Sequence, residues 1–223
     1  MRAMTEAAFV KVPSDGCRLE GGIHVWGFPA DSSSGSLLSQ DEVLRAANFQ
    51  ALDARAAFVA GRSGLRRAAS LYTGIPVTEL LIETAPDGKP HFSNAEIHFN
   101  LSHTDSTVAA VFSESPVGID IESRGRCRDF VGIARRFFHP SEAVAISKSR
   151  DEEQFLRLWT AKEAMLKLSG EGISRGLPDA RPDEEGGGSL RGDQVHTVGF
   201  YFGNIIGTVA SFQPFEVKGW FRF

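Results

Sequence analysis

A long uninterrupted helix is the feature that most constrains how this chain can fold. No Gly or Pro occurs between Asp151 and Ser169, and the segment is rich in the strong helix formers Ala, Leu, Met, Lys and Glu. Lys162 projects into the middle of its apolar face, where a solvated lysine is not expected. Helical spacing forms that face from the large side chains of Phe155, Leu158, Trp159, Met165 and Leu166. The helix is therefore predicted to pack against the rest of the fold, with a buried cation on its packed face.

The same helix carries an ion pair that has two interpretations. Glu163 and Lys167 are four residues apart and lie together at the edge of the apolar face. For a helix considered alone, the simpler interpretation is an amphipathic core helix with one surface ion pair. The alternative is a functional site, and it gains weight because a second acidic segment, residues 117–122, precedes the helix.

The second acidic segment is predicted to be a strand. Ile119 and Ile121 point to one side of it, while Asp120 and Glu122 point to the other, roughly 7 Å apart. Taken alone, such a pair is also compatible with a solvated strand face. Half-sheltered carboxylates this close repel each other unless a cation or a proton lies between them. With Glu163 they would supply three hard oxygen ligands, a set that suits Mg²⁺ bound to substrate phosphates.

Cationic side chains that could hold those phosphates occur in both parts of the chain. Lys167 lies beside Glu163, and further candidates in the first half are Arg62, Arg66, Lys89 and His103. An arginine-rich loop, residues 124–128, follows the acidic strand. It is either a solvated loop or a docking surface for an acidic protein partner.

Composition excludes several classes of protein. The 223 residues are 42% hydrophobic, which is enough for one large domain or two small halves. A net charge of −4 argues against a dedicated nucleic-acid binder. Cys17 and Cys127 provide no disulfide framework, and no signal peptide or membrane-spanning apolar run is visible. We therefore expect a cytoplasmic protein that binds neither nucleic acid nor membrane.

The order of predicted elements suggests two similar halves. Predicted strands cover 23–28, 97–103, 107–112, 117–122, 195–202, 205–212 and 216–223, and predicted helices lie within 39–71, from about 130, from 139 and at 151–169. Residues 58–67 align with 158–167 at a constant offset, which places Arg62 over Lys162. The predicted division is a loose lead-in at 1–21, an N-terminal half at 22–113 and a C-terminal half at 114–223. The glycine-rich stretch within 178–192 is predicted to be a flexible loop or a hairpin tip.

Two motifs resemble the signatures of a known family. Residues 117–122 (VGIDIE) and 159–167 (WTAKEAMLK) resemble those of the Sfp-type 4′-phosphopantetheinyl transferases. The resemblance extends to residues 87–90 (DGKP) and 99–103 (FNLSH), in the family's order and spacing. It implies an α/β (α+β) fold of two pseudo-symmetric halves, each with a small antiparallel-rich sheet packed with helices, and a monomeric protein.

The resemblance also implies a role for each charged residue of the two signature motifs. Asp120, Glu122 and Glu163 would hold Mg²⁺ on the pyrophosphate of coenzyme A. Glu163, directly or through a water molecule, would take the proton from the attacking serine. Lys167 would contact the phosphates, and Lys162 would be a buried cation near the carboxylates, which completes the implied catalytic set.

The first half would supply the remaining coenzyme A contacts implied by the resemblance. Ser102 and His103 would lie at the phosphates, Lys89 and Pro90 at the adenine, and Arg62 with Arg66 at the 3′-phosphate. The family often has more basic residues ahead of the Arg62 position, whereas residues 47–52 contain none. The identity of the 3′-phosphate contacts is thus left open.

The implied activity is a group transfer. A serine of an apo acyl or peptidyl carrier protein would attack the phosphorus that bears pantetheine, with Mg²⁺ bound, and 3′,5′-ADP would leave. Two other classes stay in view: a Mg²⁺-dependent phosphodiesterase or nuclease, and a non-catalytic module that binds coenzyme A or a carrier protein. The acidic balance counts against the first, and the presence of three carboxylates with Lys167 counts against the second. The sequence does not distinguish polyketide, peptide and fatty-acid carriers.

Overall fold

The computed structural model describes residues 4–12, 16–30, 37–104, 107–170, 177–183 and 185–222. Within them, one sheet has the strand order β2 (Val10–Lys11), β13 (Val217–Arg222), β3 (Ile23–Pro29), β7 (Thr107–Ser113) and β6 (His98–Thr104). A second sheet has the order β8 (Val117–Ser123), β12 (Ile205–Ser211), β11 (Asp193–Phe202), β10 (Gly187–Leu190) and β9 (Ala180–Pro182), with β1 (Thr5–Glu6) beside β11. A small hairpin joins β4 (Ile82–Thr84) to β5 (Pro90–Phe92).

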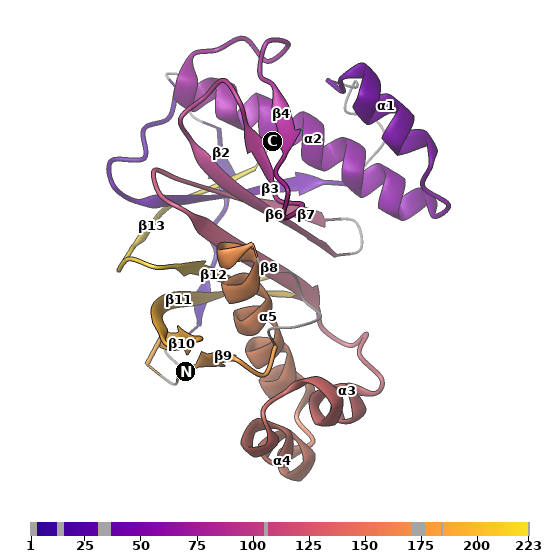
Figure 1. Cartoon of the computed structure of the whole chain (residues 1–223), viewed down its shortest axis with the longest axis vertical. Coiled ribbons are helices and arrows are strands. Elements are labelled where there is room, and N and C mark those ends of the chain that lie inside the picture. The colour runs from indigo at the N-terminus through magenta and orange to yellow at the C-terminus, as the bar shows by residue number, and fades with distance from the viewer. Residues whose placement is uncertain are drawn as a thin grey trace.

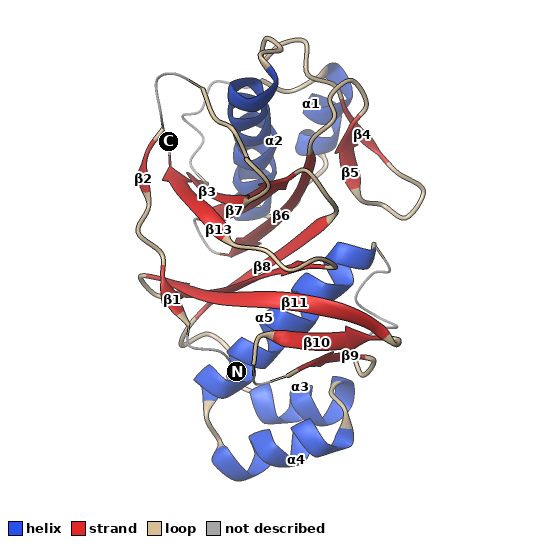
Figure 2. Cartoon of the chain, turned by 90° about the vertical axis from the view of Figure 1, so that its left-hand side faces the viewer, coloured by secondary structure: helices blue, strands red, loops and turns tan. Residues whose placement is uncertain are grey.

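Two long helices cover the outer faces of the two large sheets, and the shorter helices pack beside them (Figures 1 and 2). The helices are α1 (Gln40–Ala47), α2 (Leu52–Thr73), α3 (Phe130–Phe137), α4 (Pro140–Ser149) and α5 (Glu152–Ser169). Helix α2 packs on β3 and β7 of the first sheet, while α5 packs on β8 and β12 of the second. This arrangement confirms the predicted mixed α/β class, with two sheets that are each packed against helices.

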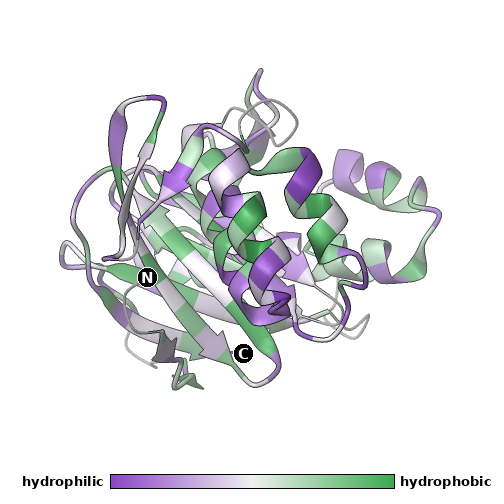
Figure 3. Ribbon diagram, turned by 90° about the horizontal axis from the view of Figure 1, so that it is seen from below, coloured by the Kyte–Doolittle hydropathy of each residue, from purple (hydrophilic) through white to green (hydrophobic). Residues whose placement is uncertain are grey.

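Hydrophobic side chains fill the spaces between these layers. Trp26, Leu65 and Phe112 belong to the core between α2 and the first sheet. Ile119 and Ile121 lie in a separate core with residues of β3 and β7, so the two sheets pack face to face. Figure 3 shows hydrophobic stretches along the strands and mixed hydrophobic and hydrophilic stripes on the helices. The predicted alternation of the β8 strand is thus confirmed, because its isoleucines face the other sheet.

Local sequence signals set the helix ends as predicted. Ser39 and Glu42 form a capping box at the start of α1, and Gly74 ends α2 in the left-handed conformation with φ of 71°. Asp151 caps the start of α5 through the backbone N–H groups of Glu153 and Gln154. Parts of three predicted features lie outside the described residues: residues 1–3 and 13–15 of the lead-in, residue 184 of the glycine-rich stretch and residue 223 of the last predicted strand.

The ends of the chain join the two sheets together. Strand β1 pairs with β11 of the second sheet, whereas the last strand, β13, pairs with β3 and β2 of the first. Figure 1 accordingly shows the N label in the lower lobe and the C label in the upper one. The lead-in at 1–21 therefore contains short strands, and the glycine-rich segment near 187 pairs as β10. The predicted division at residues 113 and 114 stays a prediction.

Strands β6 and β8 are neighbours at the junction of the sheets. In the described part of the chain, side chains of every second residue of β6 bond to β8 in place of a backbone ladder. The bonds are Asn100 Oδ1 from Ile119 N–H at 3.0 Å, Ser102 Oγ from Ile121 N–H at 3.3 Å, and Thr104 Oγ1 to Ser123 Oγ at 3.1 Å. We call these contacts the polar seam. The first two satisfy backbone N–H groups of β8, which a buried strand cannot leave unpaired.

Candidate active site

The candidate site lies where α5 crosses β8. The close approach depends on Gly118, because a Cβ atom there would overlap the carbonyl oxygen of Ala164 and lie 2.7 Å from the nitrogen of Leu168. The acidic face of β8 consequently points at the helix. Asp120 Oδ1 and Lys167 Nζ form an ion pair of 2.6 Å.

Ser102 brings the first half of the chain into this site. Its hydroxyl donates to Asp120 Oδ1 at 2.8 Å, and it accepts a hydrogen bond from Lys167 Nζ at 3.0 Å. The contact combines residues from β6, β8 and α5, which are far apart in the sequence. The structure thus brings a side chain of β6 into contact with side chains of β8 and α5.

Glu163 is buried beside this group, with an exposed fraction of 3%. Burial, together with the charges of Asp120 and Glu122, raises its pKa to about 7, while the charge of Lys167 opposes the increase. The three predicted carboxylates are thus close enough to influence one another electrostatically.

Two buried carboxylate oxygens of the site favour a bound cation. Among the described residues, Asp120 Oδ2 and Glu163 Oε1 have no hydrogen-bond partner. An unpaired buried carboxylate oxygen is costly, and a divalent cation with oxygen ligands would remove that cost. The described side chains do not form a complete group of three ligands at metal-binding distance. The residues fit a cation that takes much of its coordination shell from phosphate and water, as Mg²⁺ does.

Lys162 has a different partner from the one expected. Its ammonium group is fully buried and pairs with Glu142 Oε2 of α4 at 2.8 Å. It also donates to the carbonyl oxygens of Leu177 and Ala180. Burial lowers the pKa of Lys162, while Glu142 opposes that shift. Lys162 therefore holds α5 against α4 and the start of β9. Of Lys162 and Lys167, only Lys167 lies beside a carboxylate of the site.

Lys89 bridges the two halves of the molecule. Its Nζ atom donates to the carbonyl oxygens of Val117 at 3.3 Å and Leu168 at 3.2 Å. Burial lowers its pKa. The turn that carries Lys89 therefore lies against the start of β8 and the end of α5. Pro90 follows it as the first residue of β5 and is partly exposed.

Arg62 and Arg66 are buried on α2 and share one carboxylate. Arg66 Nη1 lies 2.9 Å from Glu42 Oε2, and Arg62 Nε lies 3.5 Å from Glu42 Oε1. Arg66 Nε also donates to the carbonyl oxygen of Leu80 at 3.1 Å. A phosphate could reach these guanidinium groups only if α1, which carries Glu42, moved or the pairs rearranged.

His103 and Glu122 lie at the margin of the site. His103 follows Ser102 on β6, so strand alternation places it on the opposite face, and its side chain is exposed. Glu122 is partly buried on β8, on the same face as Asp120.

Sequence reasoning missed the acidic partners of the buried cations. Glu42 was identifiable as a capping residue and Glu142 as a first-turn acid of its helix. Their ion pairs depend on how α1 packs on α2 and α4 on α5, which no local pattern specifies. Asn100 was part of a recognised motif, but its bond to the backbone of β8 depends on the junction of the sheets.

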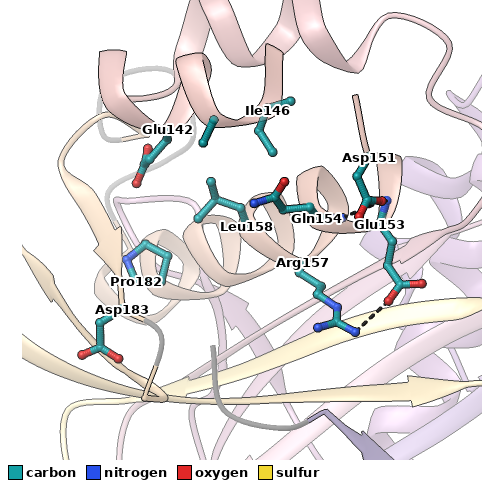
Figure 4. Close-up of a pocket in the computed structure, with 10 residues that line it drawn as sticks. Glu142, Ile146, Asp151, Glu153, Gln154, Arg157, Leu158, Pro182 and Asp183 are labelled. Atoms are coloured by element: carbon teal, nitrogen blue, oxygen red, sulfur yellow. Dashed lines mark hydrogen bonds and ion pairs between the residues drawn. The ribbon is translucent and has the colours of Figure 1, made fainter. Parts of the chain in front are cut away.

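A separate cavity of about 630 Å³ lies between α4, α5 and the β9 region (Figure 4). Its acidic residues are already bonded within the protein: Glu142 to Lys162, Asp151 to the backbone of Glu153 and Gln154, Glu153 to Tyr201 and Arg157, and Asp183 to the backbone of Glu185 and Gly187. Because each of these carboxylates already accepts hydrogen bonds from other described residues, we assign the cavity no role.

Comparison with known proteins identifies the class of enzyme. Residues 116–208 match the model of the 4′-phosphopantetheinyl transferase superfamily. The chain is 32% identical over 186 residues to the 4′-phosphopantetheinyl transferase HetI of a Nostoc species, covering 77% of this chain and 78% of that protein. It is 35% identical over 173 residues to the transferase gsp of Aneurinibacillus migulanus, covering 76% and 68%. With Sfp of Bacillus subtilis it shares 35% identity over 101 residues, or 44% of each chain.

These matches and the site define a transferase that activates carrier proteins. The chain belongs to the 4′-phosphopantetheinyl transferase superfamily. None of the described helices combines the length and the apolar character needed to cross a lipid bilayer.

Proposed function

We propose that this enzyme moves the phosphopantetheine arm of coenzyme A onto a serine of an apo acyl or peptidyl carrier protein, with Mg²⁺ bound and with release of 3′,5′-ADP. The observation that carries the proposal is a pair of buried oxygens, Asp120 Oδ2 and Glu163 Oε1, which lack a hydrogen-bond partner among the described residues and lie in the same site as the cation of Lys167. This arrangement suits a divalent cation that also binds a pyrophosphate.

Asp120, Glu122 and Glu163 would hold the metal. Bound Mg²⁺ would supply positive charge to the pyrophosphate of coenzyme A, where negative charge increases as the bond to 3′,5′-ADP breaks. Lys167 would contact the same phosphates, because its ammonium group is partly exposed and already pairs with Asp120.

Glu163 would act as the general base. Its raised pKa of about 7 makes it a stronger proton acceptor than an ordinary glutamate, and a base whose pKa lies near the working pH is well matched to proton transfer. It would take the proton of the carrier serine, directly or through a water molecule, as the serine oxygen bonds to phosphorus. General-base assistance of this kind is worth about 10²–10⁴-fold in rate.

The remaining coenzyme A contacts would come from the first half. We propose Lys89 and Pro90 near the adenine, His103 near the phosphates, and Arg62 or Arg66 at the 3′-phosphate. The last contact requires rearrangement, because both arginines pair with Glu42. Lys162 would support catalysis only through the packing of α5, given its bonds to Glu142 and the β9 region.

The direct test is a mass measurement. The full chain is incubated with coenzyme A, MgCl₂ and a panel of apo carrier proteins, and the carriers are weighed intact. We expect one or more carriers to gain the mass of phosphopantetheine, and omission of Mg²⁺ to abolish the gain. Absence of any gain from a folded enzyme, whatever the carrier, would contradict the proposal.

Parallel assays test the two alternative functions, a Mg²⁺-dependent phosphodiesterase or nuclease and a non-catalytic binding module. A phosphodiesterase or nuclease would cleave plasmid DNA, and a binding module would retain coenzyme A or carrier without a mass change. Sedimentation of the enzyme alone tests the further proposal that it is a monomer.

A further inference from the structure

The hydroxyl group of Ser102 uses its full hydrogen-bonding capacity inside the protein. It lies on β6, and the residue is 5% exposed. The oxygen accepts from Ile121 N–H at 3.3 Å and from Lys167 Nζ at 3.0 Å, and the hydroxyl donates to Asp120 Oδ1 at 2.8 Å. A serine hydroxyl has one proton and two acceptor lone pairs, so these three bonds leave no position for a fourth.

The direction of the Ser102 proton follows from its neighbours. A backbone amide and an ammonium group are donors only, so the two bonds from Ile121 and Lys167 occupy both lone pairs. The hydroxyl proton must then point to Asp120. Because the amide belongs to the residue after Asp120, Ser102 is fixed to the backbone of β8 as well as to the carboxylate.

This bond sets the orientation of the Asp120 carboxylate. Its Oδ1 atom receives both the Ser102 hydroxyl and Lys167 Nζ, the latter at 2.6 Å. Its Oδ2 atom is buried and has no partner in the described part of the chain, as is also true of Glu163 Oε1. One oxygen is therefore held by protein donors, and the other is left for a cation.

We infer that Ser102 is a positioning residue, which orients Asp120 for the metal ion, and that it does not itself bind coenzyme A. The inference rests on the proposed function, because it needs the metal that Asp120 and Glu163 would hold. It assigns to Ser102 a role different from the phosphate contact that the family resemblance implies.

The polar seam provides a matched control for this role. Ser102→Ala removes the hydroxyl that touches Asp120. Thr104→Val removes another seam hydroxyl of β6, which bonds to Ser123 instead. Both changes leave the side-chain volume nearly unchanged, so a general weakening of the junction should affect both variants similarly. Asp120→Asn removes a proposed metal ligand and serves as the positive control.

Two binding measurements separate the possible roles of Ser102. Binding of Mn²⁺ to the full chain with coenzyme A is followed by electron paramagnetic resonance, with protein-free coenzyme A as background. Binding of coenzyme A in EDTA is followed by calorimetry. A second-layer contact to a metal ligand typically changes metal affinity about 10- to 100-fold. We expect Ser102→Ala to lose Mn²⁺ affinity by about tenfold or more. Its affinity for coenzyme A in EDTA should stay close to that of the parent protein. Thr104→Val should match the parent protein in both measurements.

The outcomes distinguish this inference from the proposed function. If Ser102→Ala binds Mn²⁺ like the parent while Asp120→Asn does not, the positioning role is wrong and the metal site stands. Weaker coenzyme A binding in EDTA by Ser102→Ala would establish a direct contact and overturn the inference. Equal losses in Ser102→Ala and Thr104→Val would assign the effect to the seam as a whole. If Asp120→Asn binds Mn²⁺ like the parent, the proposed metal site itself fails. Should Ser102→Ala not fold, Ser102→Cys repeats the test, because a thiol is only a weak donor.

Discussion

At the scale of single residues, two carboxylates of the site differ in burial and in hydrogen-bond donors. Asp120 is held by two donors, whereas Glu163 is buried, has one oxygen without a partner in the described segments and has a pKa raised to about 7. Two carboxylates of one site therefore differ in their readiness to take a proton. The sequence predicted that these residues would meet, since their spacing on a strand and a helix is regular. It could not predict the difference, which depends on burial and on donors from β6.

The raised pKa of Glu163 predicts a pH-dependent stability of the metal-free protein. Between the ordinary value of 4.5 and about 7, the folded chain keeps a proton that the unfolded chain has lost. The contribution of this group to the free energy of unfolding should therefore fall as pH rises through that window and level off above it. Urea unfolding in EDTA measures it. Glu163→Gln, which has no such proton, should lack this contribution, and an unchanged pH profile in that variant would contradict the assignment.

At the scale of elements, the contact of α5 with β8 positions the chemistry. Strong helix formers and end caps made α5 predictable from residues 151–170, and alternation made β8 predictable. Their closeness was not predictable, because it rests on the missing side chain of Gly118 and on backbone atoms of a distant helix turn.

Replacing Gly118 by alanine should separate α5 from β8. The new Cβ would meet backbone atoms of Ala164 and Leu168, which cannot rotate away as a side chain can. We expect a loss of about 2 kcal/mol or more in the free energy of unfolding, together with a loss of transferase activity. Gly61→Ala is the control, since its Cβ would make ordinary contacts of 3.6 Å on α2 and should stabilise by about 0.5–1 kcal/mol. Similar behaviour of the two variants would show that the close approach is unimportant.

The buried pair of Lys162 and Glu142 gives a second prediction for the elements. Lys162→Met leaves the partly buried Glu142 without its main partner and should lower the free energy of unfolding by about 3 kcal/mol. Adding Glu142→Gln should recover part of that loss, so the double variant should be more stable than the sum of the single changes implies. Denaturant unfolding of the four proteins measures the coupling. A catalytic cation would behave otherwise: Lys162→Met would lose Mn²⁺ or phosphate binding while stability hardly changed.

At the scale of the whole molecule, the sequence showed two similar halves but not how they are joined. The internal repeat and the order of elements indicated two units, and the structure has two sheets that each pack against helices. The exchange of β1 and β13 between the sheets was not predictable. A two-residue strand such as Thr5–Glu6 has no periodicity, and the partner of a terminal strand is set by tertiary packing alone.

That exchange predicts how the enzyme should behave when its chain is cut. A break between residues 113 and 114 leaves β13, a neighbour of β3, on the second fragment, and leaves β1, a neighbour of β11, on the first. Each fragment alone would then expose unpaired strand edges and half of the core between the sheets, so we expect both to be unfolded when produced singly. Produced together, they should assemble into an active complex, because every strand regains its neighbours. Co-purification through a tag on one fragment, circular dichroism and the carrier mass assay provide the measurements. A cooperative thermal transition in either isolated fragment would show that the halves are independent domains and that the shared strands are dispensable.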